Sequence, residues 1–423
     1  MTAWKFLHAA DIHLDSALRG LDSYPGAPVE EIRGATRRAF DRLIELAIEE
    51  RVAFVLIAGD LYDGDWKDYN TGLYFNKCMA RLNAVGIRVF LIAGNHDAAS
   101  QISRQLRPPE NVTLFSSREP QTEILDELGV AIHAQGFAQR VVTDDLSLAY
   151  PQADPGYFNI GMLHTCLDGK PGHEPYAPCR VDGLRSKGYD YWALGHVHQR
   201  EIVSEAPWIV FPGNIQGRHI RESGAKGCTL VHVEEHRVVA VEARELDVMR
   251  WSSCRLDASP HADADAVYEQ LRDSLRHLLD EADGRPLAVR LFIEGASRAH
   301  AALHADRDRW EQEYRALASG LDGAGIWLEK VVFDTRPAVS LDDMLARDDA
   351  LGGLLGAIHD LELDEESLRS LATDLQPLRK KLPPELLGGE DAFDPTEGAQ
   401  LKAALEDIKA LLLTRLLSPE ADA

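Results

Sequence analysis

Short apolar runs, each followed by a polar side chain, recur along the first half of the chain. They lie at residues 6–7, 52–58, 89–93, 160–163 and 191–194. Continuous apolar runs separated by helical patterns are typical of strands buried on both faces, in layered sheets with helices outside. We therefore predict an α/β architecture for this part of the chain, with layered sheets and helices outside.

The pattern changes after Val238. Strands are predicted at 251–257, 287–294 and 326–334, and helices at 262–281 and 302–319. This strand–helix–strand–helix–strand order predicts a small α/β module, and no catalytic motif falls within it. Without a catalytic motif, the module could be structural or could form a dimer contact.

The remainder of the chain is helical in pattern and acidic. Five apolar residues fall at helical spacing and make one apolar face, namely Leu401, Leu405, Ile408, Leu412 and Leu416. Such a face packs on its own domain or docks to a partner helix. With 423 residues, two or three domains are expected, and we place them at 1–245, 246–336 and 337–423.

The polar residues that follow the apolar runs are types that bind metals. In chain order they are Asp11, His13, Asp60, Asn95, His164, His196 and His198. Residues at the carboxyl ends of parallel strands converge on one edge of a sheet. Mixed carboxylate, amide and imidazole sets suit Mn, Fe, Zn or Co better than Ca. Seven ligands exceed one tetrahedral ion and fit two ions about 3.5–4 Å apart that share a carboxylate. Asp60 is the natural bridge, because it is the lone carboxylate at its strand end.

The tetrad Gly94-Asn95-His96-Asp97 offers three functional groups at consecutive loop positions. An amide oxygen can ligate a metal, an imidazole can donate a proton to a leaving group, and a carboxylate can orient that imidazole. The tetrad therefore predicts a catalytic role in addition to metal binding.

The ordered set of motifs resembles the calcineurin-like metallophosphoesterases over roughly residues 3–235. The resemblance implies a two-sheet sandwich followed by a capping domain and a helical C-terminal region. It also implies that one metal is held by Asp11, His13, Asp60 and His198, and the other by Asp60, Asn95, His164 and His196. His96 would be the catalytic imidazole and Asp97 its orienting partner. Two divalent ions are the expected cofactors, Mn²⁺ first, with Mg²⁺, Fe²⁺, Co²⁺ and Zn²⁺ as alternatives.

Details of two loops narrow the resemblance. Protein phosphatases continue the motif at Asp60 with Asp-Arg-Gly. This chain reads Gly59-Asp60-Leu61-Tyr62-Asp63-Gly64-Asp65 and lacks the arginine that grips a terminal phosphate. Residues 8–16 and 211–222 resemble the SbcD-type DNA repair nucleases, most closely the YhaO-type branch. Four polar residues of the second loop are candidates to contact a phosphate backbone, namely Gln216, Arg218, His219 and Arg221.

This narrower resemblance implies a metal-dependent DNA exonuclease or endonuclease that acts in DNA repair or end processing. Relatives in that family bind an SMC-like coiled-coil ATPase through C-terminal helices, so we expect this partner. They also dimerise through early helices. Residues 69–85 could form such a contact or could cover the sheet.

The charge of the chain leaves a second substrate class open. A net charge of −24 disfavours nonspecific DNA binding over the whole surface. Residues 336–423 carry 19 acidic and nine basic side chains, so this region is the least suited to lie on DNA. The alternative is a phosphodiesterase or phosphatase acting on small nucleotides or other phosphoesters. A non-catalytic regulatory subunit is a third interpretation, and the intact ligand set argues against it.

Targeting features are absent from the sequence pattern. Met1-Thr2-Ala3-Trp4 leads directly into the first predicted strand, and no apolar run reaches transmembrane length. The five cysteines are scattered and include no Cys-x-x-Cys pair. We expect a cytoplasmic protein with reduced thiols and without membrane contact.

Overall fold

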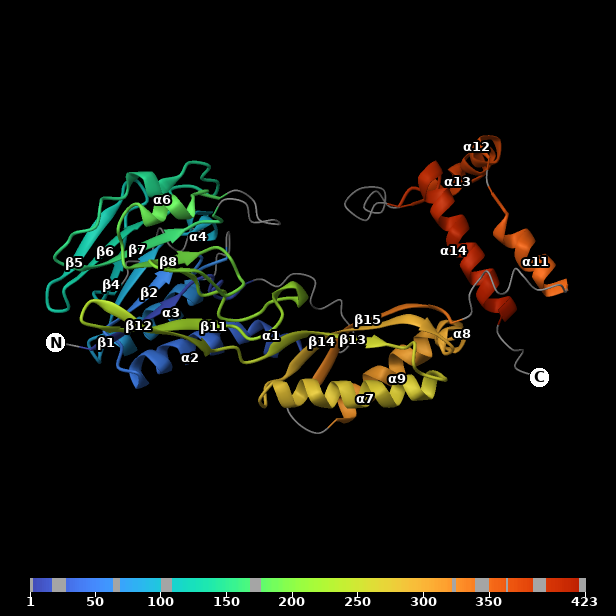
Figure 1. Cartoon of the computed structure of the whole chain (residues 1–423), viewed down its shortest axis with the longest axis horizontal. Coiled ribbons are helices and arrows are strands. Elements are labelled where there is room, and N and C mark those ends of the chain that lie inside the picture. The colour runs from blue at the N-terminus through green and yellow to red at the C-terminus, as the bar shows by residue number, and fades with distance from the viewer. Residues whose placement is uncertain are drawn as a thin grey trace. The chain divides into compact units, whose positions relative to one another are not determined.

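The computed structural model (Figure 1) describes residues 3–16, 28–63, 69–99, 109–167, 176–321, 325–338, 350–362, 364–382 and 393–417. The chain divides into two compact units. One comprises residues 1–253, 278–290 and 321–329, and the other comprises 254–277, 291–320 and 330–423. The predicted boundaries at 245 and 336 remain predictions.

Two six-stranded sheets form most of the first unit. The first has the order β12-β11-β1-β2-β3-β4, and its strands are β1 (Trp4–Ala9), β2 (Phe54–Ala58), β3 (Arg88–Ile92), β4 (Val112–Leu114), β11 (Gly227–Glu234) and β12 (Arg237–Glu245). The second has the order β5-β6-β7-β8-β10-β9, and its strands are β5 (Gln121–Leu125), β6 (Val130–Gln135), β7 (Phe158–His164), β8 (Tyr191–Gly195), β9 (Glu201–Glu205) and β10 (Trp208–Phe211). This confirms the predicted two-sheet α/β class.

Each sheet has a parallel centre and antiparallel edges. Strands β1 to β4 are parallel in the first sheet, as are β6, β7, β8 and β10 in the second. β11 and β12 add antiparallel strands to the first sheet, and β5 and β9 add them to the second. The central strands are buried on both faces, which explains why they read as unbroken apolar runs.

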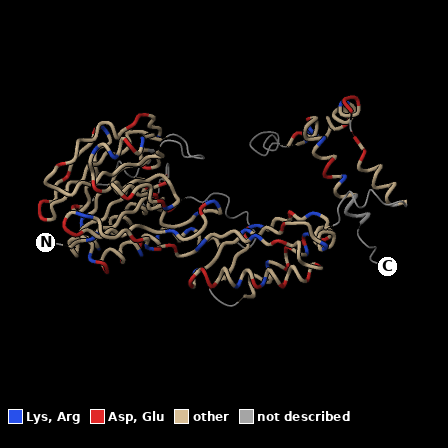
Figure 2. The backbone as a smooth tube through the Cα atoms, viewed as in Figure 1, with Lys and Arg blue, Asp and Glu red and all other residues tan. Residues whose placement is uncertain are grey.

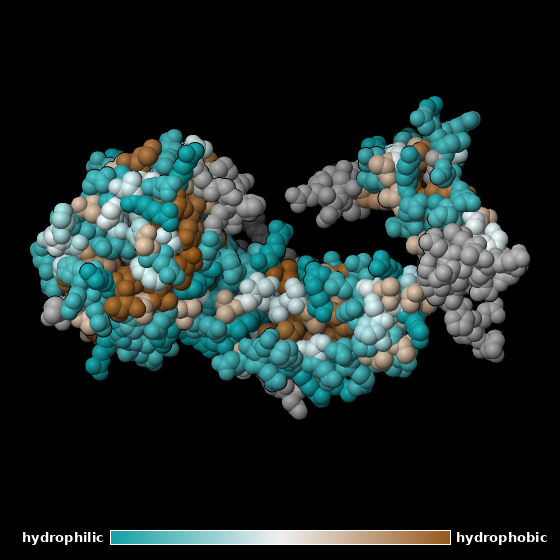
Figure 3. Space-filling view, in the orientation of Figure 1, coloured by the Kyte–Doolittle hydropathy of each residue, from teal (hydrophilic) through white to brown (hydrophobic). Residues whose placement is uncertain are grey.

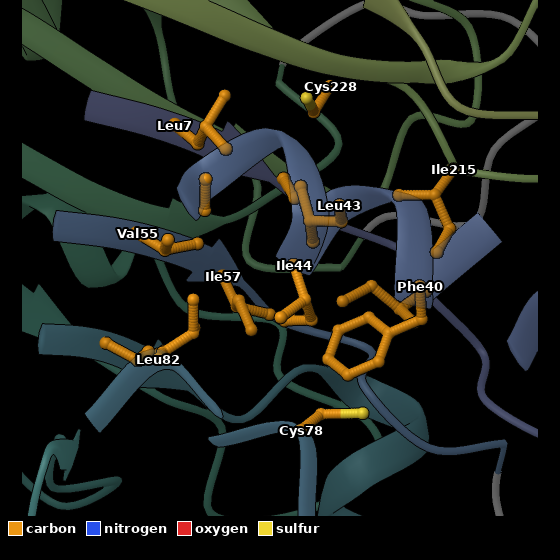
Figure 4. Close-up of a cluster of buried hydrophobic side chains, with 14 of the residues drawn as sticks. Leu7, Phe40, Leu43, Ile44, Val55, Ile57, Cys78, Leu82, Ile215 and Cys228 are labelled. Atoms are coloured by element: carbon orange, nitrogen blue, oxygen red, sulfur yellow. The ribbon is translucent and has the colours of Figure 1, made fainter. Parts of the chain in front are cut away.

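Alternate residues of the first sheet enter two different cores, because successive strand residues point to opposite faces. Phe6, Phe54 and Phe90 pack in the cluster that also holds Ile160 and Tyr191 of the second sheet. The strand residues next to them, such as Leu7 and Val55, pack in a separate cluster (Figure 4). This cluster also contains Phe40, Leu43 and Cys78, which come from two helices. Hydrophobic burial on both faces therefore stabilises the first sheet, which carries half of the predicted metal-ligand positions.

Helices α2 (Ala35–Glu49) and α3 (Tyr69–Asn83) supply the helical side of this cluster. The shorter helices of the unit are α1 (Val29–Arg33), α4 (Asn95–Ala99) and α6 (Val181–Arg185). In α3 the residues Phe75, Met79 and Leu82 are buried, so this helix covers the sheet, while Leu73 is 58% exposed. The sheet-covering role anticipated for residues 69–85 is thus present, and a dimer contact through the exposed side stays a prediction.

A third sheet has the order β13-β14-β15. Its strands are β13 (Arg250–Asp257), β14 (Leu287–Ser297) and β15 (Ile326–Pro337), and its long helix is α7 (Ala264–Glu281). These elements match the predicted module closely. The bounds shift by up to three residues, and the predicted helix 302–319 is two helices, α8 (His300–Ala305) and α9 (Arg307–Gly320). Asp306 lies between them and caps the second, since its carboxylate accepts from the amide of Arg309.

The C-terminal region contains the helices α11 (Ala350–His359), α12 (Glu365–Asp374), α13 (Gln376–Arg379) and α14 (Gly398–Leu417). The predicted apolar face lies on α14, and the side chain of Leu416 lies outside those that the structure describes. The described part of this face is only partly covered. Leu401 is 9% exposed, whereas Ile408 is 51% exposed and Leu412 is 40% exposed. Helix α14 therefore packs on its own domain at its first turn and leaves apolar side chains uncovered further along.

Candidate metal centre

Every predicted metal ligand follows, or ends, a strand of the two large sheets. Asp11 and His13 follow β1, Asp60 follows β2 and Asn95 follows β3, while His164 ends β7 and His196 and His198 follow β8. Three groups of side chains place possible ligand atoms within 4.8 Å of one another, namely Asp11 with His13 and His198, His13 with Asp60 and the predicted catalytic residue His96, and Asp11 with Asp60 and His164. The structure thus brings together residues that are far apart in the sequence.

Asp60 has the geometry of a bridging ligand. Its Oδ1 accepts a hydrogen bond of 2.9 Å from the amide of His96, which fixes the carboxylate. Its Oδ2 lies 3.9 Å from Nε2 of His13 and 3.6 Å from Nε2 of His164. One oxygen therefore faces a histidine of each predicted half-site, as a carboxylate shared by two ions requires.

Asp11 and the first half-site are fixed by the backbone. Both carboxylate oxygens of Asp11 accept from the amide of His196, at 3.1 and 2.9 Å. Nε2 of His198 lies 3.7 Å from Oδ1 of Asp11 and 3.2 Å from Nε2 of His13. Ligand atoms about 2.1 Å from a common ion lie about 3–4 Å apart, so these gaps fit a cation between the three residues.

The second half-site contains His164 and Asn95. Nε2 of His164 lies 2.9 Å from Oδ1 of Asn95, and its Nδ1 lies 3.0 Å from the carbonyl oxygen of Ala58. The backbone of β2 therefore sets the orientation of this imidazole. The ring of His196 lies 5.2 Å from the ring of His164, centroid to centroid. Among the described residues, His196 belongs to none of the three tight groups.

The close approach of the two sheets depends on small residues and unusual backbone angles. Asp11, His13, Asp60 and His196 all have positive φ values, at 50°, 46°, 52° and 100°. Such conformations are costly for residues other than glycine and concentrate at functional sites. At Gly195 an added Cβ would lie 1.9 Å from the carbonyl oxygen of Ala58, so only glycine fits where the two sheets meet.

The electrostatics of the centre also suit a cation. Burial raises the pKa of Asp11 well above its ordinary value, and the charge of Asp60 raises it further. Burial likewise raises the pKa of Asp60 and lowers the pKa of His164 to about 3. Neutral imidazoles beside buried carboxylates that repel one another form a donor set that a divalent cation would stabilise. The residues present therefore fit two divalent ions.

His96 is paired with a carboxylate that the sequence pattern did not indicate. Its Nδ1 lies 2.8 Å from Oδ1 of Asp63. Burial alone would lower the pKa of His96, but the Asp63 hydrogen bond and the charges of Asp60 and Asp63 raise it above its ordinary value. Burial would raise the pKa of Asp63, but the nearby imidazole of His13, 3.7 Å away, and the hydrogen bond with His96 outweigh burial and hold that pKa far below its usual range. His96 therefore keeps a proton more readily than an ordinary imidazole does.

Asp97 has a different place from the one predicted. Its carboxylate accepts from three backbone amides, those of Gly94 at 3.0 Å, Leu61 at 3.1 Å and Tyr62 at 2.8 Å. These bonds join the loop after β3 to the loop after β2. The side chain of His96 instead contacts Asp63, so the structure assigns the orienting carboxylate to Asp63 and a loop-joining role to Asp97.

Residues of the loop between β10 and β11 divide into buried and exposed positions. Gln216 is 2% exposed, and its side-chain amide bonds the backbone of Gly217, Met249 and Val248. The prediction that Gln216 contacts substrate is therefore wrong, because its polar atoms are committed within the protein. The side chain of His219 is 54% exposed, and Arg221 is exposed. These two residues keep their candidate role.

Arg218 lies inside the site. Its side chain is 12% exposed, and Nη2 lies 2.9 Å from Oε1 of Glu222. Nη1 lies 3.9 Å from Oδ2 of Asp63. The same Oε1 of Glu222 lies 2.7 Å from Nδ1 of His198. Arg218 therefore belongs to a network behind the metal ligands, and a phosphate contact by this side chain would have to displace that network.

Two residues of this network, Asp63 and Glu222, could not be predicted from the sequence pattern. Both stand in segments noted above, one three residues after Asp60 and the other at the end of the second loop. Neither follows an apolar strand, so the pattern that found the other ligands could not select them. His8, adjacent to the first motif, bonds Tyr191 at 3.0 Å and the carbonyl of Leu194 at 3.0 Å, and so joins the two sheets behind the centre.

With this fold and this centre, the chain belongs to the calcineurin-like metallophosphoesterase family. The family model for calcineurin-like phosphoesterases matches residues 5–200. The model for the middle domain of metallophosphoesterase YhaO matches residues 251–336. The match of the second model agrees with the position of the third sheet.

Curated relatives share sequence with about 70% of the chain. The uncharacterized metallophosphoesterase YhaO of Bacillus subtilis is 35% identical over 301 residues, which cover 70% of this chain and 73% of that protein. The DNA double-strand break repair protein Mre11 of Sulfurisphaera tokodaii is 23% identical over 313 residues, which cover 70% of this chain and 75% of that protein. Among solved structures, TT1561 of Thermus thermophilus covers 58% of this chain and 100% of that chain, with 13% identity and a TM-score of 0.35.

The helices of the described residues do not suit a membrane span. None of them combines the length and the apolar character that crossing a membrane would require.

Proposed function

We propose that this protein is a two-metal phosphodiesterase that cleaves DNA, as an exonuclease or endonuclease in DNA repair or end processing. The observation that carries the proposal is the metallophosphoesterase centre in a chain related to Mre11 DNA double-strand break repair proteins. We take manganese as the physiological metal, because carboxylate, amide and imidazole ligands together suit Mn²⁺.

The bound ions would polarise a phosphate oxygen and lower the pKa of a water molecule. His96, with its pKa raised by Asp63 and Asp60, would carry a proton at Nε2 toward the departing sugar oxygen. Because Nδ1 of His96 is bonded to Asp63, Nε2 is the nitrogen left to face the substrate.

The surroundings of the centre favour a diester over a monoester. Recognition of a terminal phosphate commonly uses an arginine fork with free N–H groups. Here Nε and Nη2 of Arg218 are committed to Glu222, at 3.3 and 2.9 Å. The guanidinium in this network is therefore a poor clamp for a monoester.

A second candidate function has one observation in its favour. The net charge of −24 opposes contact with a long polyanion, and Figure 2 shows acidic residues on the C-terminal helices α12 and α14. A phosphodiesterase or phosphatase acting on small nucleotides would meet less of this repulsion. DNA would have to approach along the exposed basic side chains near the centre, such as Arg221.

The partners of the protein are also proposals. An SMC-like coiled-coil ATPase would dock on the apolar side chains of α14, among which Leu411 is 52% exposed. Hydrophobic residues, brown in Figure 3, are visible among the C-terminal helices. Self-association through α3 would cover Leu73. A cytoplasmic location is supported by the five cysteines, which are buried and free.

The test uses the full-length chain loaded with Mn²⁺ or Mg²⁺. It is given single-stranded and double-stranded DNA, bis-p-nitrophenyl phosphate and p-nitrophenyl phosphate. We expect cleavage of DNA and of the diester, with little release from the monoester. Diester cleavage without any action on DNA would support the small-nucleotide alternative, and strong monoester cleavage would contradict both the diester preference and the proposed nuclease.

A further inference from the structure

We propose that Glu222 is the positioning residue of the metal ligand His198. It would hold the imidazole so that Nε2, and not Nδ1, faces Asp11 and His13. The inference deepens the proposed function, because it concerns the first half-site of the same metal centre.

The carboxylate of Glu222 is enclosed and fully engaged. The residue lies in the turn η3 (Ile220–Glu222) and is 4% exposed. Oε1 lies 2.7 Å from Nδ1 of His198 and accepts from Nη2 of Arg218 at 2.9 Å. Oε2 accepts from the amide of Arg218 at 2.8 Å and from Nδ2 of Asn214 at 3.0 Å. A buried carboxylate with this many donors is held in one orientation.

The contact with Glu222 selects one protonation form of His198. An ionised carboxylate only accepts hydrogen bonds, so Nδ1 of His198 must carry the proton. Nε2 is then unprotonated and able to bind a metal. This atom lies 3.7 Å from Oδ1 of Asp11 and 3.2 Å from Nε2 of His13. The hydrogen bond from Nδ1 to Glu222 therefore leaves the lone pair on Nε2 of the same ring to face the metal.

His198 differs in this respect from the ligand of the second half-site. His164 is oriented by a backbone carbonyl, that of Ala58, at 3.0 Å. Because this acceptor is a backbone oxygen, no side-chain substitution removes it directly. The side chain of His198 is 28% exposed and has a side-chain acceptor. Loss of Glu222 should therefore weaken the first half-site and leave the second largely intact.

Arg218 also secures the carboxylate of Glu222. Its guanidinium bonds Glu222 through Nε and Nη2, and its Nη1 lies 3.9 Å from Asp63, the partner of His96. The carboxylates that orient His198 and His96 thus share one cation. Because Arg218 balances the charge of Glu222, the network does not add an uncompensated anion to the centre.

The first experiment compares Glu222→Gln with Glu205→Gln in the full-length chain. Glu205 is an exposed residue at the end of β9, so its substitution is the matched control. A glutamine at 222 keeps the shape but presents an NH₂ group to donors. Outer carboxylate partners of metal-bound histidines contribute about 10–100-fold to metal affinity. We expect one of the two Mn²⁺ sites of Glu222→Gln to weaken by that factor, measured by titration with electron paramagnetic resonance.

Thermal unfolding of the metal-free variants separates positioning from folding. Unchanged Mn²⁺ affinity in Glu222→Gln overturns the inference. Equal weakening of both sites together with a lower Tm of the metal-free protein also overturns it, because that result identifies a folding role. Glu222→Asp keeps the charge on a shorter side chain, and we expect it to recover part of the lost affinity.

A second measurement needs no variant of Glu222. Histidine-selective ¹⁵N labelling of the metal-free wild-type chain, at a pH where imidazoles are neutral, reports which ring nitrogen carries the proton. We expect His198, assigned with His198→Asn, to be protonated at Nδ1. Protonation at Nε2 would overturn the inference even if Glu222→Gln failed to fold. If the wild-type chain binds no metal, the proposed function fails, while this measurement still tests the contact with Glu222.

Discussion

Nδ1 of His96 lies 2.8 Å from Oδ1 of Asp63, a residue that stands 33 positions earlier in the chain. The pairing gives the imidazole a raised pKa, because hydrogen bonding and negative charge outweigh the effect of burial. In the proposed function, His96 and Asp63 together form the proton-carrying unit of the site.

The first prediction concerns this pair. Asp63→Asn removes the charge that raises the pKa of His96 and loosens the orientation of the ring. General acid catalysis contributes about 10²–10⁴-fold, so we expect a loss of about 10–100-fold in kcat on a diester. The number of bound metals should stay at the wild-type value. Asp126→Asn, at an exposed position, is the control. Wild-type kcat in Asp63→Asn would contradict the assignment.

The second prediction separates catalysis from metal binding. His96→Ala should keep both metals and lose diester turnover, whereas Asp60→Ala should lose metal, because its Oδ2 faces both half-sites. Elemental analysis and diester hydrolysis, measured on the same preparations, distinguish the two outcomes. The assignment of His96 fails if the activity of His96→Ala on DNA equals that of the parent protein.

The third prediction concerns Asp97, whose carboxylate accepts from three backbone amides. Asp97→Ala would leave these buried donors without their acceptor, at a cost of about 1–3 kcal/mol for each unsatisfied group. We expect the free energy of unfolding of the metal-free protein to fall by about 2–4 kcal/mol after relaxation. Urea denaturation measures it. A stability equal to that of wild type, combined with lost turnover, would return Asp97 to a catalytic role.

The fourth prediction concerns pH. His8 is fully buried, and desolvation lowers its pKa to about 3, below the unfolded value of 6.5. The folded state therefore binds fewer protons than the unfolded state between these values, so stability is lost as the pH falls through that window. Each pH unit below 6.5 costs about 1.4 kcal/mol from this group.

His8→Gln removes this titration. Although the substitution itself lowers stability, the slope of stability against pH between about 6 and 4.5 should be shallower by about 1.4 kcal/mol per unit than in wild type. Chemical denaturation across this range, in the presence of a chelator, measures the slope. Parallel slopes in the two proteins would show that His8 does not stay neutral in the folded state.

The fifth prediction concerns the exposed residues of the loop between β10 and β11. Arg221→Glu should weaken DNA binding, and the dependence of affinity on salt should become less steep, because one phosphate contact is lost. Metal content should not change, since Arg221 is exposed and no ion pair joins it to the metal ligands among the described contacts. Fluorescence anisotropy with labelled DNA at several salt concentrations tests this. Unaltered binding would remove Arg221 from the DNA-contacting surface.

Several features of the fold could be read from the sequence because burial leaves a local pattern. β2 and β8 are buried at every position, so they appear as unbroken apolar runs. The helix predicted at 302–319 was wrong in its continuity, because Asp306 caps a second helix. A single capping side chain can end one helix and start another, and the average spacing of apolar residues does not reveal it.

The adjacency of His96 and Asp97 illustrates the limit of sequence reasoning at the site. Both lie in helix α4, where consecutive residues point in different directions and do not face one another. Asp97 therefore turns to the backbone of the neighbouring loop, and His96 turns to Asp63. Gln216 was predicted to face substrate because it is polar, yet its amide satisfies buried backbone groups.

The sequence by itself determined which strands are buried and which ligand types stand at their ends, since both follow from local patterns of hydrophobic and polar residues. Only the tertiary structure decided the pairings of Asp63 with His96 and of Glu222 with His198. These contacts join loops that follow different strands, and their geometry depends on how the two sheets pack. The buried carboxylates decide which nitrogen of His96 and of His198 carries a proton. Their arrangement is therefore a property of the folded chain.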